Sequence, residues 1–138
     1  MPAPLPTPAL YLLFNHRLTV AQDRDARQTL GVEKIVAPPD HIRRLWAQIP
    51  PEVDDPATFL APVLQWLTDA PRRGDYLLVQ GDFGATCLVV KRALLRGIIP
   101  VYSTTRREAV EHRYPDGRIE LQHTFCPVSY THLTLPTN

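Results

Sequence analysis

Short, nearly continuous apolar runs recur along the chain and predict buried strands. Residues 9–14 (ALYLLF) form the first run, and residues 32–37 (VEKIVA) and 75–80 (DYLLVQ) form two more. Unbroken apolar runs of this length are typical of strands covered on both faces of a parallel sheet. A fourth strand is predicted over residues 98–102, where Pro100 indicates an edge position or a bulge.

Between these runs, apolar residues recur at helical spacing. Residues 20–30 predict a helix that begins after Thr19, with Gln22 at the spacing of a capping box, and that ends at Gly31 in a left-handed conformation. The other predicted helices are residues 41–48 with Asp40 as the cap, a helix that begins at Asp55 or Thr58 and ends before Pro71, and residues 85–96.

The order of these elements predicts the fold class. Strands that alternate with amphipathic helices indicate an α/β protein with a mostly parallel, Rossmann-like sheet and helices on both faces. Residues 108–114 and 118–125 alternate polar and apolar side chains around Pro115, Asp116 and Gly117, which predicts a C-terminal β-hairpin.

The two ends of the chain differ in character from the middle. Residues 1–8 carry a proline at every second position and predict a flexible lead-in. Residues 127–138 (PVSYTHLTLPTN) resemble a translated sequencing adaptor. Tyr130 and His132, which lie in this segment, are therefore not proposed as functional groups. A genuine flexible tail is the alternative. Residues 9–126 are therefore expected to form a single domain.

Composition narrows the class of protein. The chain has 138 residues, of which 44% are hydrophobic and 21% charged, with a net charge of +1. This balance excludes a basic protein that coats long nucleic acid and a wholly disordered chain. No apolar run reaches the roughly 18–20 residues of a membrane span, and the N-terminus has no signal-peptide pattern, so we expect a cytoplasmic protein without a membrane partner. Cys87 and Cys126 form no C-x-x-C pair, so no metal site or disulfide is indicated.

Three polar or glycine-bearing segments follow apolar strands: residues 15–16, 80–86 and 103–107. Ligands of open parallel sheets bind beyond the carboxyl ends of the strands, near the point where the strand order reverses. We therefore expect these three segments to form the binding site.

The segment after the third predicted strand carries the strongest local signal. Its glycines are expected to allow positive φ and close approach of a ligand, and the following helix N-terminus favours a phosphate, with a threonine hydroxyl as a further donor. It is neither a Walker A motif nor a G-x-G-x-x-G fingerprint. The alternative is a tight turn in which Asp82 only caps the helix. The candidate ligand-binding residues are Gln80, Gly81, Asp82, Phe83, Gly84, Ala85 and Thr86.

The other two segments supply hydroxyls, guanidiniums and an imidazole. Thr104 and Thr105 offer hydroxyls, while Arg106 and Arg107 offer bidentate donors for phosphate. A solvated start of the hairpin is the alternative for this group.

Asn15 and His16 are suited to a ribose or base edge, and His16 to acid–base catalysis, unless it is structural. Cys87 is expected in the first turn of a helix, where the pKa of a thiol is lowered. A packing role is nevertheless favoured for Cys87. Trp46 and Trp66 are expected in the core, and the pairs Arg43–Arg44 and Arg72–Arg73 on the solvated surface.

The chain also resembles a known family in a series of motifs whose order and spacing extend over residues 10–125. The family is the CRISPR-associated Csx type numbered twenty, an accessory of type III CRISPR systems. The motifs are Phe14-Asn15-His16 with Leu18-Thr19 and Gln22, Asp25-Ala26, Leu30-Gly31-Val32, Leu45-Trp46 with Ile49-Pro50, Gly74-Asp75-Tyr76, the residues from Val79 to Thr86, and the residues from Pro100 to Glu108.

The resemblance implies a fold related to the CARF domains and a standalone ring nuclease. The implied ligand is a cyclic oligoadenylate, above all cyclic tetra-adenylate, whose cleavage switches off CRISPR signalling. The ligand is two-fold symmetric, which favours an isologous homodimer. The implied mechanism needs no metal or cofactor: a ribose 2′-OH attacks the adjacent phosphodiester and leaves a 2′,3′-cyclic phosphate.

Under this resemblance, the candidate catalytic residues are His16, Asn15 and Arg106, and the ligand contacts are the residues named above together with Thr104, Thr105 and Arg107. Two alternatives stay open: a non-catalytic protein that sequesters the ring, and an unrelated nucleotide-binding Rossmann module. The family chain continues through its last strand where this one has residues 127–138.

Overall fold

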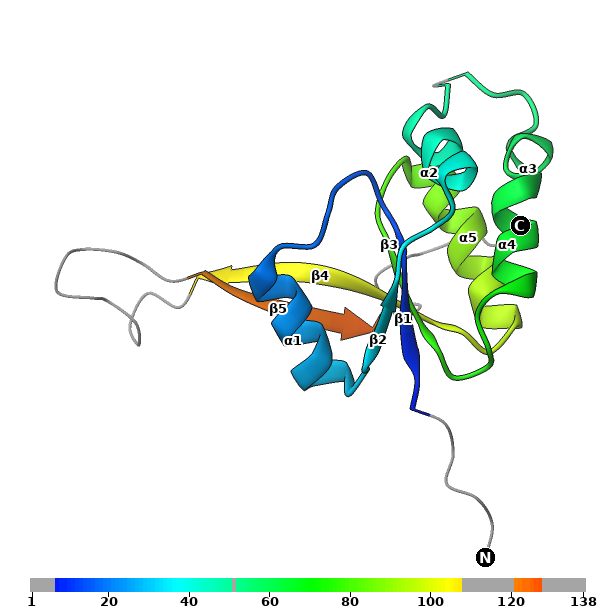
Figure 1. The fold of residues 1–138 in the computed structure, drawn as a ribbon. Coiled ribbons are helices and arrows are strands. Elements are labelled where there is room, and N and C mark those ends of the chain that lie inside the picture. Colours follow the sequence, from blue (N-terminus) through cyan, green and yellow to red (C-terminus); the bar gives the residue numbers. More distant parts are fainter. Residues whose placement is uncertain (1–6, 51, 108–120, 128–138) are drawn as a thin grey trace, which may run out of the picture.

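A computed structural model describes residues 7–50, 52–107 and 121–127 of the chain. The described part is an α/β sheet structure with helices on both faces, as the sequence predicted (Figure 1). The elements are β1 (Ala9–Leu13), α1 (Val20–Leu30), β2 (Lys34–Val36), α2 (Asp40–Ala47), α3 (Pro56–Phe59), α4 (Ala61–Asp69), β3 (Tyr76–Val79), α5 (Phe83–Leu95), β4 (Ile99–Arg107) and β5 (Leu121–Pro127).

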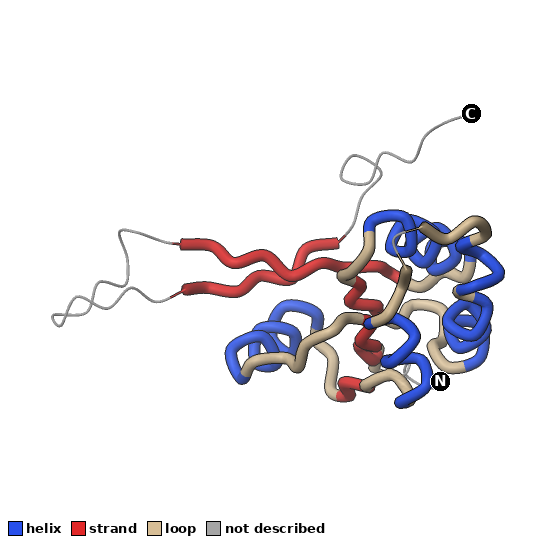
Figure 2. The backbone as a smooth tube through the Cα atoms, turned by 90° about the horizontal axis from the view of Figure 1, so that it is seen from above, coloured by secondary structure: helices blue, strands red, loops and turns tan. Residues whose placement is uncertain are grey.

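The strand order places β3 in the middle of the sheet, with β1 beside it. The five strands are ordered β2-β1-β3-β4-β5; β1 to β4 pair in parallel, and β5 pairs antiparallel to β4. Figure 2 shows β4 and β5 extending together beyond the rest of the sheet as a two-stranded ribbon. The mostly parallel sheet with a final antiparallel strand is the predicted fold class.

Each face of the sheet has its own hydrophobic cluster, because neighbouring residues of a strand point to opposite faces. Leu77 of β3 packs with α2, α4 and α5, whereas the adjacent Leu78 packs with Ala26 of α1 and Phe125 of β5. All four side chains are almost completely buried. The sheet is thus held between one helix on one face and a group of helices on the other.

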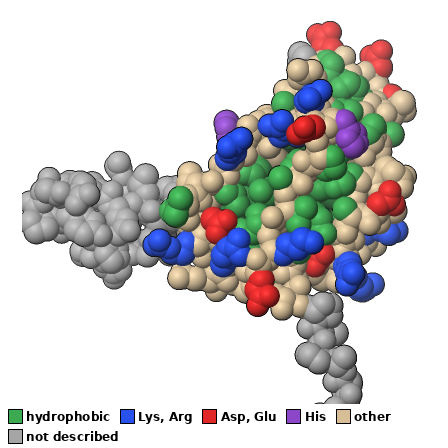
Figure 3. All heavy atoms as spheres, viewed as in Figure 1, with side chains coloured by type: hydrophobic (Ala, Val, Ile, Leu, Met, Phe, Trp, Pro, Cys, Tyr) green, Lys and Arg blue, Asp and Glu red, His purple; other side chains and the backbone are tan. Residues whose placement is uncertain are grey.

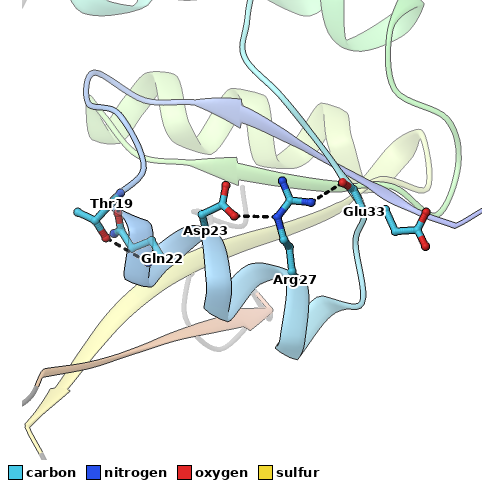
Figure 4. A network of polar contacts seen from close by, with 5 residues as sticks. All are labelled: Thr19, Gln22, Asp23, Arg27 and Glu33. Carbon is cyan, nitrogen blue, oxygen red and sulfur yellow. Dashed lines mark hydrogen bonds and ion pairs between the residues drawn. The ribbon is translucent and has the colours of Figure 1, made fainter.

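The first helix follows the sequence prediction in detail. The Thr19 hydroxyl accepts a hydrogen bond from the Gln22 amide, and the Gln22 side chain accepts one from the Thr19 amide, which completes the capping box. Gly31 ends the helix at φ 69°. Arg27 donates to the Asp23 carboxylate and to the Glu33 carbonyl, so it links the helix to the segment that enters β2 (Figure 4).

Two helix predictions require correction. Asp40 is not the cap of α2: Pro39 occupies that position, and the Asp40 carboxylate instead accepts from Arg43. The helix expected from Asp55 or Thr58 is divided into α3 and α4 at Leu60. Pro62 explains the division, because it has no N–H to donate to the carbonyl four residues earlier. Asp55 does cap α3, by accepting from the Thr58 amide.

The fourth strand is much longer than predicted. β4 continues through residues 103–107, which were expected to form a loop, because each of them pairs with a residue of β5. β4 is also flanked by β3 and β5, so Pro100 is not on an edge strand. It is tolerated because the described pairing with β5 begins only at Val101.

Several predictions lie outside the described residues. These are the lead-in over residues 1–6, the hairpin turn within residues 108–120, and Tyr130 and His132 in residues 128–138. β5 itself includes Pro127, the first residue of the segment that resembles an adaptor. Across the described part of the chain, no helix has the length and apolar character needed to cross a membrane.

Candidate functional site

The carboxyl ends of β1 and β3 meet at the point where the strand order reverses. β1 pairs with β2 on one side and with β3 on the other, and the chain leaves β1 toward α1 on one face and β3 toward α5 on the other (Figure 1). The Gln80 amide donates to the Leu13 carbonyl at 3.1 Å, which ties the two strand ends together. Exposed Asn15 and His16 therefore share one edge of the sheet with residues 80–84, as predicted.

The helix after β3 begins two residues earlier than predicted and is capped by its own chain. The Asp82 carboxylate accepts from the Ala85 amide at 3.0 Å, and the Asp82 carbonyl accepts from the Thr86 amide at 2.8 Å. The amides of Phe83 and Gly84 open the helix and have no intrahelical acceptor. Asp82 thus caps α5, and its negative charge offsets part of the attraction of this helix end for an anion.

Gly81 and Gly84 do not serve the conformational role expected of them. The glycines with positive φ in the described chain are Gly31, Gly74 and Gly97. Gly84 is the second residue of α5, where helical φ is negative.

Gly81 is required instead for packing against a tryptophan. A Cβ at Gly81 would lie 2.8 Å from Nε1 of Trp46, and this same nitrogen donates to the Gln80 carbonyl at 2.9 Å. A Cβ at Gly84 would meet only the Asp82 carboxylate, at 3.5 Å. In this turn, the space that a ligand could enter is therefore at Gly84 and not at Gly81.

Side chains in the first turns of α5 differ widely in exposure. Phe83 is 69% exposed although it is aromatic, and Ala85 is 2% exposed. The Thr86 hydroxyl is buried, and no hydrogen-bond partner for it is present in the described part of the chain. Phe83 thus offers a free aromatic face at this edge, whereas Ala85 can contribute little more than its backbone.

A cavity beside the start of α5 was not predicted. It has a volume of about 280 Å³ and lies between the α2–α3 connection and the first turn of α5. Its walls include Ile49, Val53 and Phe59 together with Asp82 and Gly84. The apolar residues around the prolines of the α2–α3 connection were the available signal, but only the fold brings that connection to α5.

β4 contributes hydroxyls that are already engaged. Ser103 accepts from the Gln22 side chain at 3.5 Å, and the Thr104 hydroxyl donates to the Thr124 carbonyl at 3.3 Å. The register Leu78↔Val101 places Ser103 near the level of Gln80.

Arg106 lies about 10 Å farther along the strand than Ser103, on the ribbon that extends beyond the sheet (Figure 2). The side chains of Thr105, Arg106 and Arg107 lie outside the described part. The described geometry therefore brings Asn15 and His16 to residues 80–84, and it assigns the two arginines to a projecting strand.

The remaining sequence predictions have mixed outcomes. Burial raises the pKa of the Cys87 thiol, so the expected lowering is wrong; Cys87 is half-buried in the second turn of α5. Trp46 is buried, and half-buried Trp66 packs edge-on to Tyr11 with ring centroids 6.0 Å apart. The arginine pairs 43–44 and 72–73 are exposed, as expected.

Comparison with known proteins assigns the chain to a family. The model of the "Uncharacterized protein MJ1673 family" matches residues 8–131. The chain belongs to the MJ1673 family. It is 44% identical over 112 residues to "Uncharacterized protein MJ1673" of Methanocaldococcus jannaschii, which covers 81% of this chain and 86% of that protein. No solved structure matches the chain. The family match covers every element from β1 to β5, so the MJ1673 family as a whole is expected to share the edge at which β1 and β3 end.

Proposed function

We propose that this MJ1673-family protein is a ring nuclease of the Csx type numbered twenty that binds and cleaves a cyclic oligoadenylate, with cyclic tetra-adenylate as the first candidate. The proposal depends on the motif resemblance described above. The observation that carries it is that Asn15 and His16 follow β1, and the start of α5 follows β3, at the same edge of the sheet beside its reversal point. This is the position at which open α/β sheets bind nucleotides.

The surroundings of Phe83 support a nucleotide ligand. An exposed aromatic ring stacks on a nucleobase, and such stacking contributes about 1–3 kcal/mol per base. Phe83 is 69% exposed, and the amides of Phe83 and Gly84 begin a helix of 13 residues. A phosphate accepts hydrogen bonds from amides in this position. A base and an adjacent phosphate can therefore be bound at one helix end.

The proposed chemistry is an intramolecular transesterification. A ribose 2′-oxygen forms a bond to the adjacent phosphorus, the bond from phosphorus to the 5′-oxygen breaks, and the products carry a 2′,3′-cyclic phosphate and a 5′-hydroxyl. His16 is proposed to accept the 2′-hydroxyl proton, water to supply the proton of the new 5′-hydroxyl, and Asn15 to hold the ribose or base. Arg106, with Arg107, is proposed to neutralise charge on the phosphorane. No metal or cofactor takes part in this scheme.

The proposed ligand also determines the expected assembly and location. A two-fold symmetric ring is best contacted by equivalent edges of two subunits, so the active form is proposed to be a homodimer. The ligand would be encountered in the cytoplasm, where we place the protein. By cleaving the cyclic oligoadenylate that activates antiviral nucleases, the protein would restrain those nucleases.

One observation favours sequestration as a second candidate function. His16 is exposed and makes no hydrogen bond within the described chain; its aromatic neighbour is Phe14, with ring centroids 6.5 Å apart. A catalytic base is usually oriented by a further group. If ligand binding does not order His16, the protein would hold the ring intact.

The deciding experiment is incubation of the purified protein with radiolabelled cyclic tetra-adenylate in EDTA, with the products separated on a gel. Linear products that end in a cyclic phosphate are expected, and His16→Ala is expected to abolish them while binding remains. An intact ring that migrates with the protein would identify sequestration. An intact ring without binding would contradict both, and would leave the nucleotide-binding Rossmann module.

Matched variants of α5 test the position of the site. Phe83→Ala is expected to weaken binding of cyclic tetra-adenylate about tenfold or more. Leu95→Ala is the control, because Leu95 is 77% exposed at the opposite end of the same helix. Equal affinities of the two variants would place the ligand elsewhere. Arg106→Ala combined with Arg107→Ala tests the charge contribution of β4 in the same assay.

A further inference from the structure

A larger cavity lies at the opposite edge of the sheet, where β1, β2 and β3 begin. Its volume is about 850 Å³, which is within the usual range for small-molecule sites. Ala9, Tyr11 and Asp75 are among its lining residues, together with three cations: Lys34 at the start of β2, and Arg72 and Arg73 from the α4–β3 turn. This edge is separate from the proposed ring site, which lies at the carboxyl ends of the strands.

The turn that carries the two arginines is fixed by a buried carboxylate. Asp75 is 8% exposed, and its oxygens accept from the amides of Ala9 at 3.1 Å and of Arg72 at 2.8 Å. The Asp75 amide donates to the Arg72 carbonyl, and the Ile99 amide donates to the Asp75 carbonyl. The turn is therefore bonded to β1 on one side and to β4 on the other, so both arginines start from a rigid backbone.

Arg73 is held in place by a close contact with Gly97. A Cβ at Gly97 would lie 2.6 Å from Cγ and 3.2 Å from Nε of Arg73, so the arginine stem occupies the space that a side chain would fill. The Gly74 amide donates to the Gly97 carbonyl at 2.9 Å beside this contact. The stem of Arg73 is thus packed beside Gly97, and the residue also lines the cavity.

The positive charge of the cavity exceeds the negative charge that lines it, because Asp75 is the one acidic residue among its lining residues against Lys34, Arg72 and Arg73. Within residues 7–50, 52–107 and 121–127, none of Lys34, Arg72 and Arg73 forms an ion pair. The carboxylate of Asp75 is turned toward backbone amides. Figure 3 shows Lys and Arg side chains along the lower part of the face seen in Figure 1, with Asp and Glu side chains among them.

We propose that this cavity binds a small anion that carries at least two phosphate groups. Guanidinium groups bind phosphate oxygens in a bidentate manner, and two adjacent arginines with a lysine across the cavity match a charge greater than that of a single phosphate. The volume also exceeds what one phosphate would fill. The phosphates come either from an inorganic polyphosphate or from a nucleotide.

Isothermal titration with pyrophosphate tests the proposal on the full chain. Saturable binding is expected, and Arg72→Gln combined with Arg73→Gln is expected to lower the affinity at least about tenfold, since each substitution removes charge-assisted hydrogen bonds to phosphate oxygens. These substitutions keep the Cβ and Cγ atoms of both side chains and the backbone bonds of the turn. The matched control is Arg43→Gln combined with Arg44→Gln, an exposed adjacent pair on α2, which is expected to bind normally.

A second titration with ADP identifies the source of the phosphates. Tighter binding of ADP than of pyrophosphate assigns the cavity to a nucleotide, and equal binding assigns it to the phosphates alone. In either case, the affinity for both probes is expected to fall in the variant that carries Arg72→Gln and Arg73→Gln. No saturable binding of either probe, or equal affinities for the two double variants, would overturn the proposal. Cyclic tetra-adenylate binding by the Arg72 and Arg73 variant is expected to be unchanged, so this test does not depend on the proposed function.

Discussion

Gly81 and Gly84 are three residues apart, but their surroundings predict opposite effects on stability. Gly81→Ala would place a methyl group against the indole of Trp46, where the nearest atom is at 2.8 Å. Overpacking of this kind costs about 1–3 kcal/mol, and we expect the urea midpoint of unfolding to fall accordingly.

Gly84→Ala is the matched control. It adds a methyl group that would make only an ordinary contact, with the Asp82 carboxylate at 3.5 Å, in a helix where alanine is favoured over glycine by up to about 1 kcal/mol. A midpoint equal to or above that of the original chain is expected. If both substitutions lowered the midpoint equally, Trp46 would not be the reason for glycine at position 81.

The Cys87 thiol provides a second test at the residue scale. Because burial raises its pKa, less thiolate forms at a given pH than in the unfolded chain. In a Cys126→Ser variant, the rate of alkylation by iodoacetamide is expected to rise with pH along a curve shifted above that measured in urea. A curve shifted to lower pH than the urea reference would show that the N-terminal half of α5 lowers the thiol pKa more than burial raises it.

At the scale of elements, local signals were sufficient for α1 and insufficient for β4. Thr19 and Gln22 are three residues apart at the start of α1, and Gly31 directly follows its last residue, so the limits of α1 could be predicted from the sequence. The length of β4 depends on pairing with β5, about twenty residues away at Thr104↔Thr124, and no local pattern carries that information.

The candidate site could likewise be predicted only in part. Asn15, His16 and residues 80–84 follow strands, and the rule for parallel sheets brings them to one edge. The packing of Gly81 on Trp46 and the two cavities join segments distant in sequence, so only the three-dimensional structure shows them.

The contact between α1 and β5 gives a prediction at this scale. The Asp25 carboxylate accepts from the Phe125 amide at 3.0 Å across 100 residues of sequence. Asp25→Ala would leave that partly buried amide without its acceptor, which costs about 1–3 kcal/mol. Faster hydrogen exchange of the Phe125 amide and a lower urea midpoint are expected.

Asp23→Ala provides the control on the same helix. Asp23 pairs with Arg27 with both side chains roughly half exposed, and such pairs contribute about 0–1 kcal/mol. Equal exchange at Phe125 in the two variants would mean that Asp25 does not hold β5.

At the scale of the whole molecule, the two edges of the sheet have different chemistry. The carboxyl edge presents Asn15, His16 and the exposed ring of Phe83, whereas the amino edge presents Lys34, Arg72 and Arg73 around a cavity. The two buried clusters between these edges are separated by the sheet and share β1 and β3. Ligands at the two edges are therefore expected to bind without excluding each other.

The proposed homodimer leads to a prediction of stoichiometry. One chain offers a single pair of segments, residues 15–16 and 80–84, to a ring that has two equivalent halves. Sedimentation velocity with labelled cyclic tetra-adenylate is expected to show one ring bound by two chains, with the dimer favoured as ligand is added, because binding to the dimer alone shifts the equilibrium toward it. Phe83→Ala should reduce this shift, while Leu95→Ala should not. A complex of one chain with one ring would contradict the symmetric arrangement and would require the single edge between β1 and β3 to hold the whole ligand.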